Sequence, residues 1–194
     1  MKKILICGGH LTPAIALIDE FENQKDINIT FIGRKYATEG SSVFSQEYKI
    51  VTDKKIKFYQ ITTGRLQRKF TKFTIPSLLK IPIGFIQSLI YLIMIRPNIV
   101  VSFGGYVSCP VIICAWLLKI KSITHEQSIA PGLANKINSI FVNQIFLSWK
   151  ETEKYFDSKK TQTIGNLVRS DIFASKATDY KINDFLKNSK NLIY

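Results

Sequence analysis

Short apolar runs, each ending in or followed by glycine or a polar residue, recur along the chain between segments whose apolar residues have helical spacing. The runs that we predict to be strands are KKILIC (2–7), INITFIG (27–33), KFYQI (57–61), NIVVSFG (98–104), SITHEQ (122–127), QIFLS (144–148) and TQTIG (161–165). Short strands that alternate with helices are typical of an open parallel sheet with helices on both faces. The sequence therefore predicts an α/β fold with a doubly wound, Rossmann-like parallel sheet, which we assign to residues 1–172.

The segments between these runs predict three helices. TPAIALIDEF (12–21) follows the first run, with Thr12 placed to cap the helix and Pro13 in its first position. VIICAWLLK (111–119) predicts a second helix. The apolar run 83–95 is too short to span a bilayer, so we expect a mostly buried crossover helix between two parallel strands.

Composition narrows the class of protein. An apolar fraction of 46% supports a genuine core, and a net charge of +13 predicts attraction to nucleic acid, anionic lipid or a phosphorylated substrate. A lysine-rich proteome would produce the same charge without any function attached. The three cysteines form no C-x-x-C pair, which is typical of reduced thiols in a cytoplasmic protein.

Two classes of bound group are not expected. The sequence has no Asp-x-Asp pair and no carboxylate cluster, so we predict no metal ion. A complete G-x-G-x-x-G fingerprint is also missing, which disfavours NAD and FAD. We therefore expect no cofactor.

A basic and aromatic segment precedes the apolar run 83–95. Its residues are Arg65, Arg68, Lys69, Phe70, Lys72 and Phe73. Cations beside phenylalanines suit the surface of an anionic membrane, and such binding should weaken as salt rises. Nucleic acid is the competing partner, but no nucleic-acid-binding motif accompanies the segment, so we expect none.

The residues that follow the predicted strands indicate where a ligand binds, because ligands of open α/β sheets bind beyond the carboxyl ends of the strands. These residues are Gly8-Gly9-His10, Gly104-Gly105-Tyr106, His125-Glu126-Gln127-Ser128 and Gly165-Asn166, and they include both histidines of the chain. Gly8 and Gly9 lack Cβ atoms, so we expect the backbone amides at the start of the following helix to approach a ligand phosphate. These loops predict one shared site.

Taken together, the loops resemble the MurG family of N-acetylglucosaminyltransferases, glycosyltransferase family 28, from Lys3 to about Ile172. The matching pieces are GGH (8–10), GGYVS (104–108), AW (115–116), HEQ (125–127), GL and NK within 132–136, and GNLVRSDI (165–172). Three departures stand out. The first loop is shorter than the family's G-G-T-G-G-H, Ser128 replaces an asparagine, and Leu167 replaces a proline.

The resemblance implies the N-terminal half of an inverting glycosyltransferase of the two-domain GT-B type. Such an enzyme moves N-acetylglucosamine from UDP-N-acetylglucosamine to a polyprenyl-diphosphate-linked N-acetylmuramyl peptide, the step from lipid I to lipid II in peptidoglycan synthesis. It also implies a peripheral location on the cytoplasmic face of the cell membrane.

The resemblance further implies residue roles. His10 is the expected general base, with Glu126 as the alternative base or as a group that orients the acceptor sugar. Acceptor binding is expected from Gly104, Gly105, Tyr106, Ser108, Gln127 and Asn135. Donor binding is expected from Gly9, Ser128, Asn166 and Arg169.

The last residues of the chain suggest a second domain. We interpret residues 173–190 as a linker and 191–194 (NLIY) as the start of a missing donor-binding domain, so that the chain alone would be inactive. The alternative is a non-catalytic, membrane-docking half of a split, two-chain glycosyltransferase.

Overall fold

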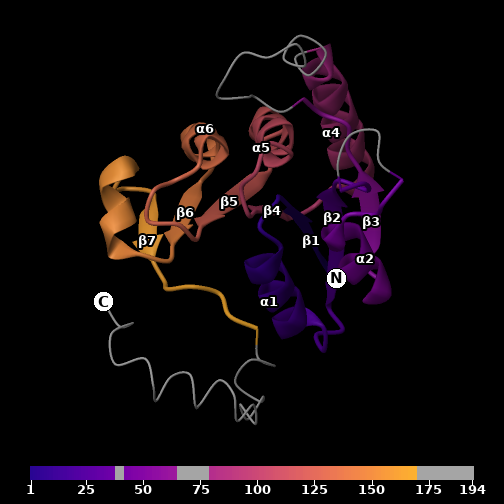
Figure 1. Cartoon of the computed structure of the whole chain (residues 1–194), viewed down its shortest axis with the longest axis horizontal. Coiled ribbons are helices and arrows are strands. Elements are labelled where there is room, and N and C mark those ends of the chain that lie inside the picture. Colours follow the sequence, from indigo (N-terminus) through magenta and orange to yellow (C-terminus); the bar gives the residue numbers. More distant parts are fainter. Residues whose placement is uncertain (38–41, 65–78, 170–194) are drawn as a thin grey trace, which may run out of the picture.

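The computed structural model describes residues 1–37, 42–64 and 79–169. Within these ranges the chain forms one sheet of seven parallel strands in the order β3-β2-β1-β4-β5-β6-β7 (Figure 1). The strands are β1 (Lys2–Cys7), β2 (Ile27–Gly33), β3 (Lys57–Gln60), β4 (Ile99–Ser102), β5 (Lys121–Glu126), β6 (Gln144–Leu147) and β7 (Thr161–Thr163). All predicted strands are present, and most end earlier than predicted because their last residues already belong to loops.

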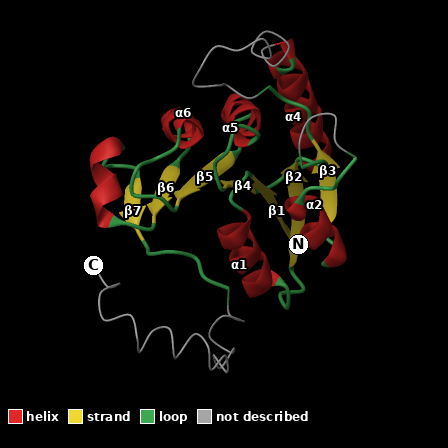
Figure 2. Cartoon of the chain, viewed as in Figure 1, coloured by secondary structure: helices red, strands yellow, loops and turns green. Residues whose placement is uncertain are grey.

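The helices lie on both faces of the sheet, as Figure 2 shows. They are α1 (Leu11–Phe21), α2 (Gln46–Asp53), α4 (Ile81–Ile95), α5 (Ser108–Leu117) and α6 (Leu133–Phe141), followed by the 3₁₀ helix η1 (Lys150–Tyr155). One core joins α1 and α2 to the sheet around Ile15, Val51 and Phe31. The other joins α4 and α5 to the opposite face around Leu92 and Ile112. The predicted doubly wound fold is therefore confirmed.

The start of α1 differs from the prediction. His10 is the N-cap and Leu11 is the first helical residue, so Thr12 does not cap the helix. The reason is local: the backbone of Gly9 and His10 hydrogen-bonds to the loop after β4, which brings the chain into helical geometry before Thr12. Pro13 consequently sits third in the helix, where it removes one backbone donor.

Helix α4 joins β3 to β4 as a crossover, but the expectation that it is mostly buried is wrong. Gly84, Ser88 and Leu92 face the protein, at a spacing that keeps them on one side of the helix. On the other side Ile86 is 60% exposed and Ile90 is 54% exposed. The helix is apolar on most of its surface, while among the described helices α5 makes its most extensive contact, so sequence periodicity could not indicate which side is covered.

Within the described ranges, no helix is both long enough and apolar enough to cross a membrane. The basic and aromatic segment 65–73 lies outside the described residues, as do residues 170–172, the proposed linker 173–190 and residues 191–194. The structure therefore does not test these assignments.

Candidate active site at the carboxyl edge of the sheet

The loops after β1 and β4 contact each other backbone to backbone. These two strands are neighbours at the point where the strand order reverses, which is where open α/β sheets bind ligands. Gly8 has a φ of +133°, and a Cβ there would lie 2.7 Å from the carbonyl oxygen of Gly104. A Cβ on Gly105, whose φ is +76°, would lie 3.0 Å from the nitrogen of Gly9. Glycine at these positions lets the two loops meet.

This contact uses the two backbone amides that directly precede α1. The amide of Gly9 donates to the carbonyl oxygen of Gly104 at 2.9 Å, and the amide of His10 donates to that of Phe103 at 3.4 Å. Pro13 has no amide. The amides of Gly9 and His10 are therefore not available to a phosphate, because the loop after β4 already accepts from both. The expectation now concerns the amides of Leu11 and Thr12, the first two residues of α1.

A cavity of about 350 Å³ opens beside this contact, and we call it the His10 cavity. Its lining includes Gly9, His10, Arg34, Gly105 and Tyr106. The Nδ1 atom of His10 is buried and has no hydrogen-bond partner among the described residues. An imidazole with an unused ring nitrogen at a cavity wall can take a proton from a bound hydroxyl group.

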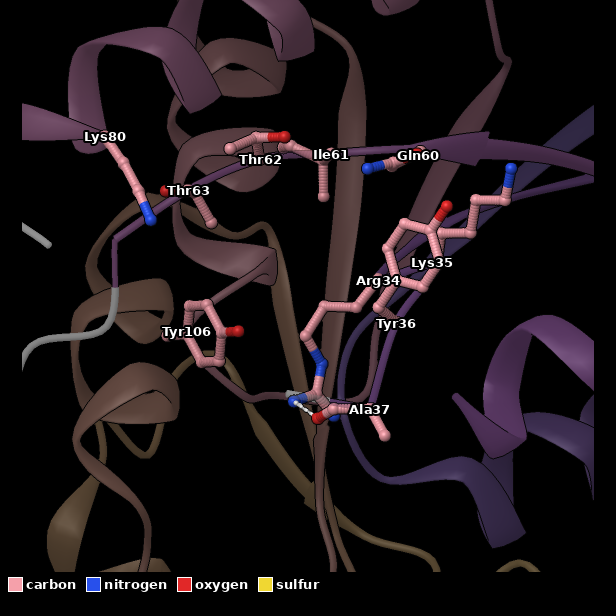
Figure 3. A pocket seen from close by; sticks show the side chains of 10 residues that line it. All are labelled: Arg34, Lys35, Tyr36, Ala37, Gln60, Ile61, Thr62, Thr63, Lys80 and Tyr106. Carbon is pink, nitrogen blue, oxygen red and sulfur yellow. Dashed lines mark hydrogen bonds between the residues drawn. The ribbon is translucent and has the colours of Figure 1, made fainter. Parts of the chain in front are cut away.

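A second cavity of about 190 Å³ adjoins the first, and we call it the Arg34 cavity (Figure 3). Arg34 and Tyr106 line both cavities, so they form the wall between them. The guanidinium carbon of Arg34 lies 5.7 Å from the centre of the Tyr106 ring, within reach of a cation–π contact.

Glu47, a buried residue at the start of α2, hydrogen-bonds to Arg34 and pairs with its charge. One carboxylate oxygen of Glu47 accepts the backbone amide of Arg34 at 2.7 Å and lies 3.5 Å from its Nε. Burial alone lowers the pKa of Arg34, but the charge of Glu47 and the Tyr106 hydroxyl outweigh it and leave the pKa above its usual value. Sequence analysis missed Arg34, although it directly follows β2 and the strand-end rule applies to it equally.

The loop after β5 is fixed by hydrogen bonds to the buried carboxylate of Glu126. Glu126 is 1% exposed. Its Oε1 accepts the amide of Ser128 at 2.9 Å, and its Oε2 accepts the amide of Gly132 at 3.2 Å and Asn135 Nδ2 at 2.9 Å. We call this arrangement the Glu126 network. It fixes the loop 127–132 and leaves the carboxylate without access to a substrate.

Asn135 and Ser108 are also engaged inside the protein. Asn135 donates to the carbonyl oxygen of His125 and accepts from the Thr124 hydroxyl at 2.9 Å. The Ser108 hydroxyl is buried, donates to the carbonyl oxygen of Gly105 at 2.8 Å and accepts from Asn138 Nδ2 at 2.7 Å. Both side chains shape the loops that line the site.

A polar chain connects β5 to the segment after β7. His125 is 2% exposed, and its Nε2 lies 3.3 Å from the Ser148 hydroxyl, which lies 3.4 Å from Asn166 Oδ1. Burial lowers the pKa of His125, and His10 lowers it further, although the Gly165 carbonyl and Glu126 act against this.

The structure brings only some of the predicted site residues together. Gly9, His10, Gly105 and Tyr106 line the His10 cavity, and Gly104 lies buried behind them. The remaining predicted residues do not line that cavity: Ser108, Glu126, Gln127, Ser128, Asn135, Asn166 and Arg169. In the part of the chain that the structure describes, no three His, Cys, Asp or Glu side chains are grouped to hold a metal ion.

Comparison with known proteins places this geometry in a family. Residues 7–147 match the model of the glycosyltransferase family 28 N-terminal domain. A protein of Borrelia hermsii named UDP-N-acetylglucosamine–N-acetylmuramyl-(pentapeptide) pyrophosphoryl-undecaprenol N-acetylglucosamine transferase is 37% identical over 96% of this chain and 49% of its own length. Its namesake from Borreliella burgdorferi is 42% identical over 79% of this chain and 40% of its own length. The chain thus spans about half the length of these relatives.

Solved structures show the same fold. MurG of Acinetobacter baumannii superposes with a TM-score of 0.63 at 22% identity, over 86% of this chain and 45% of that one. UDP-GlcNAc 2-epimerase of Neisseria meningitidis, solved with UDP-GlcNAc bound, gives 0.61 at 14% identity, over 100% of this chain and 55% of that one. With more than half of its residues matched by the family model, the chain belongs to glycosyltransferase family 28 and carries the N-terminal domain of that family.

Proposed function

We propose that the chain is the acceptor-binding domain of a hexosyltransferase that uses UDP-N-acetylglucosamine. The acceptor is a polyprenyl-diphosphate-linked N-acetylmuramyl peptide, and the product belongs to peptidoglycan synthesis. Family membership and the printed names of the relatives support this assignment.

The observation that carries the proposal is the His10 cavity at the switch point of the sheet. In a glycosyl transfer the acceptor hydroxyl loses a proton as its oxygen attacks the anomeric carbon, and UDP leaves from the opposite side of that carbon. His10 lines the wall where this hydroxyl would lie, and no described residue hydrogen-bonds the Nδ1 atom of its ring. The geometry favours His10 over Glu126 as the base, since the Glu126 carboxylate already accepts three hydrogen bonds.

The donor site remains a proposal that needs a second domain, from the same or another chain. Ser128, Asn166 and Arg169 lie on loops at the carboxyl edge but outside the His10 cavity. This position leaves them able to face a domain that holds UDP-N-acetylglucosamine across the cleft.

The assignment is tested by the reaction itself. The full-length protein that contains this chain is incubated with radiolabelled UDP-N-acetylglucosamine and a short-chain, diphosphate-linked N-acetylmuramyl peptide. We expect a labelled disaccharide product that requires both substrates. Transfer to water alone, or no transfer when both substrates are shown to bind, would contradict the assignment.

A membrane surface is the second proposed partner, and the proposed location is peripheral, on the cytoplasmic side. Helix α4 supports this, because the side that faces away from the protein carries Ile83, Ile86, Ile90 and Ile93, each about half exposed or more. The basic segment 65–73 is separated from the helix by residues 74–80. An apolar helix face beside cations is the combination that binds anionic bilayers.

Vesicle sedimentation tests this partner. The parent protein should bind vesicles that contain anionic lipid, and less so as salt rises. Replacing Ile86 and Ile90 together by glutamine should weaken binding about tenfold or more, because two apolar side chains no longer enter the bilayer. Ile164→Gln, at an exposed apolar residue beside β7, is the matched control. Equal binding to neutral and anionic vesicles would exclude the electrostatic part of the proposal.

A further inference from the structure

The Arg34 cavity has no role in the function proposed so far. We propose that it binds the diphosphate of the acceptor, with Arg34 and Lys80 contributing positive charge from opposite walls. This inference rests on the proposed function, because it uses the order of groups in the relatives' printed acceptor: N-acetylmuramyl, pyrophosphoryl, undecaprenol.

The lining of the cavity suits a phosphate. Among the described residues that line it, all charged ones are cations, and Thr62, Thr63 and Tyr106 add hydroxyl groups. Figure 3 shows the ammonium group of Lys80 directed towards the cavity and the Arg34 guanidinium beside Tyr106. Charge-assisted hydrogen bonds from arginine and lysine to phosphate are short and strong. Glu47 neither lines the cavity nor competes with the ligand, because it lies beneath Arg34 on the protein side.

Lys35 also borders the cavity, but its ammonium group is engaged elsewhere. Its Nζ lies 5.5 to 5.7 Å from the ring centres of Tyr36, Phe44 and Tyr48. This aromatic cluster holds the ammonium group by cation–π contacts and draws it away from the cavity. We therefore assign the phosphate contacts to Arg34 and Lys80 alone.

The location of the Arg34 cavity supports the diphosphate assignment more specifically than its charge does. On one side the cavity shares Arg34 and Tyr106 with the His10 cavity, where the acceptor hydroxyl reacts. On the other side it reaches Lys80, the N-cap of α4, whose sequence neighbours Leu79 and Ile83 are 70% and 46% exposed. Sugar, diphosphate and lipid then lie in the same order as the His10 cavity, the Arg34 cavity and the apolar face of α4.

Few backbone amides near the site are available to bind the diphosphate in place of the cationic side chains. A phosphate at the start of α1 would normally use the first amides of the helix. The amides of Gly9 and His10, just before the helix, donate to the loop after β4, and Pro13 has none, which leaves those of Leu11 and Thr12. Cationic side chains in the neighbouring cavity add positive charge that these two amides do not supply.

Calorimetric binding to the full-length protein tests the inference with two soluble probes. The first is a short-chain prenyl-diphosphate-linked N-acetylmuramic acid without peptide, its lactyl carboxyl group converted to an amide. The second is N-acetylmuramyl pentapeptide without diphosphate. We expect Arg34→Gln and Lys80→Gln each to weaken binding of the first probe about tenfold, as loss of a charge-assisted contact does. Binding of the second probe should change less than twofold.

Lys121→Gln, at an exposed lysine that begins β5 on the opposite edge of the sheet, is the charge-matched control and should bind both probes like the parent. Thermal unfolding of every variant is recorded, and Lys80→Gln keeps the test valid if Arg34→Gln destabilises the Glu47 contact. Unchanged binding of the first probe by both variants would overturn the inference. So would a loss confined to the second probe, which would assign the cavity to peptide carboxylates. If the parent binds neither probe, the proposed acceptor itself is wrong.

Discussion

The His10 cavity and the Glu126 network lie at the same carboxyl edge of one sheet, the first beyond the end of β1 and the second at the end of β5. In the first, Gly9, His10, Gly105 and Tyr106 surround open space, and one ring nitrogen of His10 has no partner among the described residues. In the second, the Glu126 carboxylate is buried and accepts hydrogen bonds from Ser128, Gly132 and Asn135.

This difference distinguishes residues that can act on a substrate from residues that stabilise the fold. A polar side chain that can act on a substrate needs capacity for hydrogen bonding that the protein does not already use. A polar side chain whose capacity is filled contributes to the shape of a loop, and its removal costs stability. The two regions should therefore respond to substitution in opposite ways.

The largest expected effect on stability comes from Glu126→Ala. The substitution removes the acceptor of two backbone amides and one of the two acceptors of Asn135 Nδ2, which still donates to the His125 carbonyl oxygen. We expect the free energy of unfolding to fall by about 3 kcal/mol or more, measured by denaturant titration. Glu20→Ala, at an exposed glutamate of α1, should change it by less than about 0.5 kcal/mol. A small effect at Glu126 would mean that the network is not the scaffold we describe.

The second-largest expected effect on stability comes from Gly8→Ala, which should lower the free energy of unfolding by about 2 kcal/mol or more. The residue has a φ of +133°, and its Cβ would overlap the Gly104 carbonyl, so both strain and a clash oppose the side chain. Gly9→Ala is the matched control, because a Cβ there would only reach ordinary contact, 3.6 Å from Gly105. Equal losses at the two glycines would show that the loops after β1 and β4 do not meet as described.

A smaller effect is expected from pH through His125. Its pKa is lowered in the folded state, mainly by burial, so the unfolded chain binds a proton more readily. Stability should therefore fall as pH drops below about 6.5, the ordinary pKa of histidine, by at most about 1.4 kcal/mol per pH unit. In His125→Gln this part of the pH dependence should disappear from denaturant titrations. An unchanged slope would assign the effect to other groups.

Much of the fold could be predicted from the sequence, because alternating strands and helices with glycine at the strand ends restrict the topology strongly. His10 was found for the same reason, since the strand-end rule places it at the switch point. The buried partners of Glu126 could not be found, because Asn135 lies on the following helix and only the folded chain brings its amide to the carboxylate.

Two further features needed the structure. The sequence did not indicate which side of α4 is exposed, because apolar residues lie on every face of the helix. Which residues are buried depends on where α5 packs. Arg34 is a candidate site residue because it contacts the Tyr106 ring and pairs with Glu47, and both residues are distant from it in sequence. The strand-end rule applies to Arg34, but the composition of the run FIGRK does not distinguish it from the other cations of a very basic chain.

The central claim is that His10 performs chemistry without supporting the fold. The most direct measurement compares transfer rate and unfolding free energy for His10→Ala in the full-length protein. We predict a rate lower by about a hundredfold or more, as loss of a general base typically causes, with the free energy of unfolding changed by less than about 1 kcal/mol. A rate within a few-fold of the parent, or a loss of activity explained by unfolding, would contradict the account.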